Sequence, residues 1–133
     1  INKTNFSNHN FIYLCSNIVN TEFLKKTEKL QISLQTKIIY KTIPTIKLQN
    51  KLINNLKLGK ISGATFLSKL AADTFLSLLS RYDCLSAARE IAIYCISARV
   101  AASFKKANFK FVYIASMPNE DALIKSIKKR HFA

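Results

Sequence analysis

Residues 64–104 read ATFLSKLAADTFLSLLSRYDCLSAAREIAIYCISARVAASF, and this stretch decides the fold that the sequence predicts. In its first half, apolar residues recur every three or four positions, which is the period of one face of a helix. These residues are Leu67, Leu70, Ala71, Phe75, Leu78, Leu79 and Tyr82. Lys69 and Asp73 lie four residues apart on the opposite side, where they can form a weak ion pair. The pattern predicts a helix from Ala64 to Tyr82.

The second half, from Leu85 to about Phe104, is apolar around most of a helical circumference, which is typical of a helix buried on several sides. Its apolar residues are Ala88, Ile91, Ala92, Ile93, Cys95, Ile96, Val100 and Ala102. Asp83 is the expected N-cap, and the many alanines permit close approach of a partner helix. The connection between the two predicted helices is very short, so 64–104 is predicted to be an antiparallel helical hairpin with Ala92 and Cys95 in its interface.

The flanks predict fewer and less regular elements. A helix is expected from Thr45 to near Gly59, and another after Asn119, with acids in its first turn and bases in its last. Strands are expected over residues 30–40 and Phe109–Ile114. The predicted fold class is therefore mainly α with a minor β component (α+β), with basic arms flanking the hairpin. Residues 1–133 are expected to form a single domain, with 1–20 as an extended N-terminal arm.

Charge is distributed unevenly along the chain, which carries 21 Lys and Arg against seven Asp and Glu. Residues 1–63 hold ten lysines and two acids, whereas residues 64–104 are nearly neutral. Such an excess favours association with nucleic acid or another acidic surface. The lysine clusters predict contacts to phosphate groups, because lysine suits phosphate without reading bases. The expected phosphate-binding residues are Lys25, Lys26, Lys29, Lys105, Lys106, Lys110, Lys125, Lys128, Lys129 and Arg130.

The sequence shows no recognisable set of catalytic or metal-binding residues. Both histidines lie near the termini, and no Cys-x-x-Cys, helical His pair or Gly-rich phosphate loop occurs. Cys84 and Cys95 are interpreted as small buried hydrophobes. The chain is accordingly predicted to be non-enzymatic, with no catalytic residues, metal, cofactor or small-molecule substrate.

Arg99 stands out within the predicted second helix because it projects on an otherwise apolar side. A buried arginine needs a partner. Asp73 on the preceding helix is one candidate, and an acidic group of a neighbouring subunit or a phosphate is the other.

In composition, the chain looks like subunits of large ribonucleoprotein assemblies such as organellar ribosomes. The leading hypothesis is a structural ribosomal protein that contacts RNA and neighbouring protein subunits. The alternatives are an accessory subunit of a mitochondrial respiratory or ATP-synthase complex, lying on anionic lipid, and a free nucleic-acid-binding protein. The first residue is Ile1, which indicates a fragment or a removed leader and favours a mitochondrial or other organellar location.

Overall fold

The computed structural model describes residues 9–132, which fall into two compact units, residues 9–43 and 44–132. The expected N-terminal arm over 1–20 lies partly outside the described residues, and within the rest of it residues 11–16 form a strand. The single domain expected over 1–133 stays a prediction. Among the described residues, no helix is long and apolar enough to cross a membrane.

The first unit is a β-α-β arrangement. Its elements are β1 (Phe11–Ser16), α1 (Thr21–Lys29) and β2 (Leu34–Tyr40), and the two strands pair in parallel. The Asn20 side chain accepts a hydrogen bond from the backbone N–H of Phe23 and so begins α1. The rings of Tyr13 and Phe23 lie 5.0 Å apart, so α1 packs against one face of the strand pair.

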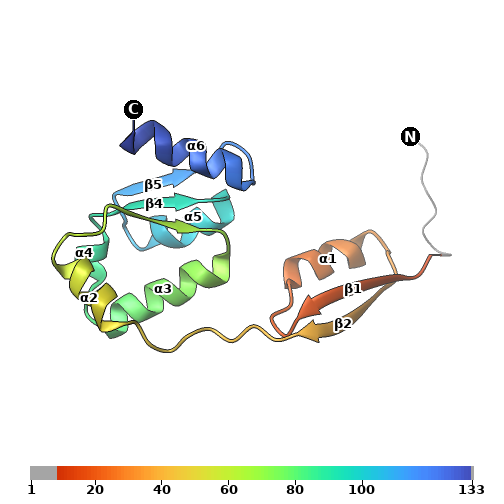
Figure 1. The fold of residues 1–133 in the computed structure, drawn as a ribbon. Coiled ribbons are helices and arrows are strands. Elements are labelled where there is room, and N and C mark those ends of the chain that lie inside the picture. The colour runs from red at the N-terminus through yellow and green to blue at the C-terminus, as the bar shows by residue number, and fades with distance from the viewer. Residues whose placement is uncertain (1–8, 133) are drawn as a thin grey trace. The chain divides into compact units, whose positions relative to one another are not determined.

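The second unit alternates helices and strands around a three-stranded parallel sheet in the order β3-β4-β5 (Figure 1). Its elements are α2 (Asn50–Lys57), β3 (Gly63–Phe66), α3 (Lys69–Arg81), α4 (Leu85–Ala88), β4 (Ala92–Cys95), α5 (Ala98–Lys106), β5 (Phe111–Ile114) and α6 (Glu120–His131). The helices α3 and α5 cover one face of this sheet, and α6 covers the other.

The core of the second unit is built around β4, the middle strand. Ile93 and Cys95 are fully buried and face the cluster formed with α3 and α5. Tyr94 is 2% exposed and packs on the other face, against Ala122 and Leu123 of α6. A middle strand of a parallel sheet is covered on both faces, so its sequence is apolar at every position.

The predicted helical hairpin is wrong, and with it the mainly α fold class: the protein is α/β with parallel sheets. The segment predicted as one helix from Leu85 to Phe104 divides into α4, β4 and α5. Continuous burial of β4 produced an apolar run that periodicity cannot distinguish from a buried helix. Ala92, expected in a helix interface, pairs with Gly63 of β3 instead. The helices α3 and α5 do pack together, but β4 separates them in sequence, and both begin at the same edge of the sheet.

Several local predictions are confirmed. The strand expected over 30–40 contains β2, and the one expected from Phe109 to Ile114 contains β5. Asn119 caps α6 by accepting a hydrogen bond from the backbone N–H of Ala122. The helix expected from Thr45 is shorter than predicted, beginning after Gln49, and Gly59 follows it with a φ of 65°. That left-handed conformation favours glycine.

Gly63 lies where the backbone of β4 leaves no room for a side chain, and Gly63→Ala is expected to destabilise the protein by about 1–3 kcal/mol. A Cβ at this position would lie 2.9 Å from the backbone oxygen of Ala92, which a paired strand cannot move aside cheaply. The free energy of unfolding from a urea titration measures the effect. Ser62→Ala, at the exposed neighbouring position, serves as the control. Equal stability of the two variants would contradict the close pairing of β3 with β4.

Candidate functional site at the carboxyl edge of the sheet

The carboxyl ends of β3, β4 and β5 all meet at one edge of the sheet, because the three strands are parallel (Figure 1). A helix starts just beyond each strand, and its N-cap side chain accepts a hydrogen bond from the first turn. Ser68 accepts from Ala71, Ser97 from Val100, and Asn119 from Ala122. Helix N-termini present unpaired N–H groups and a partial positive charge, so this edge suits an anionic ligand.

The same local sequence precedes each of these helices. An apolar strand end, one further apolar residue and a serine follow one another in Phe66-Leu67-Ser68, Cys95-Ile96-Ser97 and Ile114-Ala115-Ser116. The ladder continues past the strand ends, where Ile96 donates to Phe66 and Ala115 donates to Cys95. A serine after a buried strand can turn the chain and cap the next helix. This repeated pattern was the signal that could have located the edge from the sequence.

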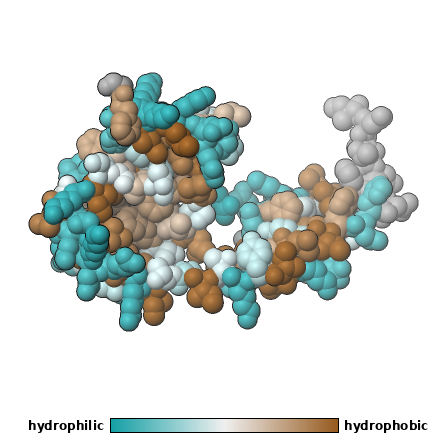
Figure 2. Space-filling model, viewed as in Figure 1, coloured by the Kyte–Doolittle hydropathy of each residue, from teal (hydrophilic) through white to brown (hydrophobic). Residues whose placement is uncertain are grey.

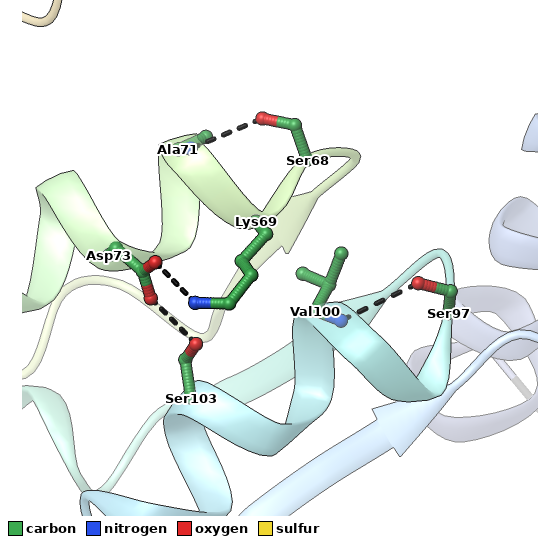
Figure 3. Close-up of polar contacts among 7 residues, drawn as sticks. All are labelled: Ser68, Lys69, Ala71, Asp73, Ser97, Val100 and Ser103. Carbon is green, nitrogen blue, oxygen red and sulfur yellow. Dashed lines mark hydrogen bonds and ion pairs between the residues drawn. The ribbon is translucent and has the colours of Figure 1, made fainter. Parts of the chain in front are cut away.

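A polar network joins α3 to α5 near this edge (Figure 3). One carboxylate oxygen of Asp73 accepts a hydrogen bond from the Lys69 ammonium at 2.5 Å. The other accepts from the Ser103 hydroxyl at 2.6 Å. The ion pair that the four-residue spacing of Lys69 and Asp73 predicted is thus confirmed, and the structure adds a bond from Asp73 to the neighbouring helix.

This network keeps Asp73 ionised. Burial by itself raises the pKa of a carboxyl group, but the hydrogen bonds from Lys69 and Ser103 outweigh it, together with the charges of Lys69 and Arg99. The net effect lowers the pKa of Asp73 below its ordinary value. At neutral pH, the interface between α3 and α5 therefore contains one fixed negative charge beside two positive ones.

Arg99 is exposed in the first turn of α5, so the expectation that it projects on an apolar side is wrong. Of the partners considered for it, Asp73 is the one whose pKa the charge of Arg99 lowers. Within residues 9–132, no hydrogen bond or close ion pair is formed by the Arg99 guanidinium. The residue joins the edge as an exposed cation.

The ten predicted phosphate-binding residues lie elsewhere, all exposed on helices or loops. Lys25, Lys26 and Lys29 are on α1, where Lys26 pairs with Glu22 at 2.9 Å. In the second unit, Lys105 and Lys106 end α5, Lys110 pairs with Glu90 at 2.6 Å, and Arg130 stacks on the Tyr113 ring. The remaining three, Lys125, Lys128 and Lys129, are on α6. Figure 2 shows hydrophilic side chains over α6 and α2. Whether these cations bind phosphate stays a prediction.

A cavity of 410 Å³ lies apart from the carboxyl edge, between β3 and the end of α6. The Tyr94 hydroxyl lies there, 2.7 Å from His131 Nε2. Burial and the neighbouring Tyr113 raise the pKa of Tyr94, against the opposing charge of Arg130.

Cys95 is buried, which raises the pKa of its thiol to about 11, although the charge of Lys105 acts in the opposite direction. In the part of the chain that the structure describes, no His, Cys, Asp and Glu side chains gather into a metal-binding group.

A three-stranded parallel sheet with helices on both faces, and with three helix N-termini at its carboxyl edge, defines the second unit as an open-sheet α/β protein. The family model for uroporphyrinogen-III synthase HemD matches residues 1–125. The chain belongs to the uroporphyrinogen-III synthase family.

A solved structure shares this fold. The crystal structure of uroporphyrinogen-III synthetase from Helicobacter pylori 26695 matches with a TM-score of 0.66 and 16% sequence identity. The match covers 93% of this chain and 55% of that one, so the chain spans little more than half the length of the matched protein. No curated protein sequence matches the chain.

Family membership overturns the function predicted from composition. The family comprises enzymes of tetrapyrrole biosynthesis, so the prediction of a non-enzymatic ribosomal or RNA-binding subunit is wrong. The two alternatives, an accessory respiratory or ATP-synthase subunit and a free nucleic-acid-binding protein, are wrong for the same reason. The partners predicted with them, RNA, protein subunits or anionic lipid without a small-molecule substrate, are wrong for the same reason. The search for paired acids, histidines and nucleophiles missed the site because its groups are backbone N–H donors and scattered cations. The organellar location stays a prediction.

Asp73→Asn is expected to make the stability of the protein depend less on pH in the acid range. Because folding lowers the pKa of Asp73, its contribution is fully present above the ordinary carboxyl pKa and is lost as pH falls through the folded value. The variant should therefore be less stable than the unaltered chain at pH 7, and the difference should shrink as the pH falls below about 4 and vanish once Asp73 is protonated in the folded protein as well. Thermal melts across this range measure it. A constant difference at every pH would contradict the assignment.

Proposed function

We propose that the chain acts in the synthesis of uroporphyrinogen III, using the carboxyl edge of its second unit to hold hydroxymethylbilane. The observation that carries the proposal is the gathering of three capped helix N-termini at this edge, in a chain that belongs to the uroporphyrinogen-III synthase family. In open α/β sheets, ligands bind outside the carboxyl ends of the strands.

The chemistry of the substrate fits this edge. Hydroxymethylbilane is a linear tetrapyrrole whose rings carry carboxylate side chains, so it is a small polyanion at neutral pH. Helix N–H groups, serine hydroxyls and cations are the donors that bind carboxylates. The edge offers Ser68 and Ser97 at the helix starts, with Lys69 and Arg99 in the adjoining first turns.

Closing the tetrapyrrole joins its two ends by a carbon–carbon bond: the terminal hydroxymethyl carbon loses its oxygen, the free α-carbon of the other end loses a hydrogen, and the two leave as water. In the type III isomer one terminal ring is also inverted, so one further carbon–carbon bond breaks and forms again. The protein must therefore bring the two ends together and favour one mode of closure over the others. Fixed donors at one edge supply that orientation, because carboxylates spread along the substrate are held at defined points. In this proposal the edge residues bind and orient the substrate.

The test is conversion of hydroxymethylbilane by the purified chain. We expect the cyclic product to be enriched in the type III isomer relative to a protein-free reaction, as measured by chromatography of the oxidised porphyrins. Ser68→Ala together with Ser97→Ala should reduce the enrichment, because two carboxylate-facing helix starts lose their caps. Glu90→Gln, remote from the edge, is the matched control. An isomer ratio equal to that of the protein-free reaction would contradict the proposal.

A further inference from the structure

Two cations lie in first turns at the carboxyl edge, one on each of two packed helices, and the charges of both act on Asp73. Lys69 is the first residue of α3, and Arg99 is the second residue of α5. Since α3 and α5 follow neighbouring parallel strands, their first turns begin at the same edge. Positions four apart share a helix face, so Lys69 lies one turn before Asp73, and Arg99 lies one turn before Ser103.

The hydrogen bond from Ser103 to Asp73 sets how these two faces meet (Figure 3). This bond connects the second turn of α5 to the second turn of α3. The first turns of the two helices therefore lie next to each other. Lys69 and Arg99 thus stand in the first turns of two helices that this bond joins. Without a counter-ion, two such cations would repel each other.

Asp73 provides the counter-ion, and it leaves donors free on both cations. Its carboxylate uses one of the three donors of the Lys69 ammonium. The side chains of Lys69 and Asp73 are 44% and 46% exposed, and Arg99 is exposed as well. A carboxylate arriving from solvent can therefore bind the remaining donors of both cations while Asp73 keeps its own bonds.

We propose that Lys69 and Arg99 together bind a carboxylate of the tetrapyrrole, and that Asp73 is the positioning residue that holds Lys69 by an ion pair and holds α5, which carries Arg99, through Ser103. The inference rests on the proposed function of this edge and names two substrate-binding side chains within it. Asp73 acts through Lys69, Arg99 and Ser103 and does not touch the substrate.

The direction in which Asp73→Asn changes the binding of a polyanion distinguishes a positioning role of Asp73 from a simple effect of its charge. Asp73→Asn makes the edge more positive, so charge alone would tighten the binding of a polyanion. The proposal requires the opposite result, because an amide cannot accept both charge-assisted bonds as the carboxylate does. Asp73→Glu retains the negative charge and should restore part of the affinity.

The experiment is a fluorescence titration of the chain with uroporphyrin, a stable cyclic polycarboxylate, over a range of salt concentrations. We expect Asp73→Asn to weaken binding about tenfold, and Arg99→Gln and Lys69→Gln to weaken it by a similar factor with a shallower salt dependence. Glu90→Gln and Lys60→Gln make the same charge changes at exposed positions ahead of β4 and β3, at the opposite edge of the sheet, and should leave binding nearly unchanged.

The possible outcomes are distinct. Equal or tighter binding by Asp73→Asn overturns the positioning role, while binding by the unaltered chain still supports the proposed function. Unchanged binding by Arg99→Gln overturns the cation pair, and this variant removes no hydrogen bond within residues 9–132, so it should fold normally. No binding of uroporphyrin by the unaltered chain contradicts both the pair and the use of this edge for a tetrapyrrole.

Discussion

Burial of β4 on both faces is the constraint on which the rest of the second unit depends. Ile93 and Cys95 require an apolar layer on one side of the sheet, and Tyr94 requires another on the opposite side. Helices α3 and α5 supply the first layer, and α6 supplies the second. Because each connection must cross from one parallel strand to the next through a helix, every helix of this set begins at the carboxyl edge. The candidate site is therefore a consequence of how the core is covered.

The edge acquires its chemistry from side chains that also stabilise the helices. Ser68 and Ser97 cap α3 and α5, and each cap leaves other N–H groups of the first turn directed outward. Asp73 links the same two helices through Ser103 and also binds Lys69, so one carboxylate adds a polar contact to the apolar packing of α3 against α5. The residues proposed to bind the ligand are thus also structural, and a search for isolated catalytic groups does not find such residues.

The charge of the chain illustrates what composition can and cannot indicate. An excess of 14 positive charges favours an anionic partner, but it does not distinguish a nucleic acid from a small polycarboxylate. The lysines at the ends of α5 and α6 were predicted to bind phosphate, because they are close together in the sequence and are easily recognised as clusters. Lys69 and Arg99 are 30 positions apart and were not recognised as a pair, since only the packing of α3 against α5 brings them to one edge.

Local features whose signals lie within one or two helical turns could be predicted from the amino-acid sequence. These include the Asn119 cap, the turn at Gly59, the Lys69–Asp73 pair and most of the helix ending at Arg81. The strand over residues 92–95 could not be predicted, because full burial removes the alternation that marks a strand, and the pairing partners lie far away in sequence. The site depends on the same long-range pairing: parallel alignment of β3 with β4 places Ser68 and Ser97 at one edge, and no local pattern carries that information.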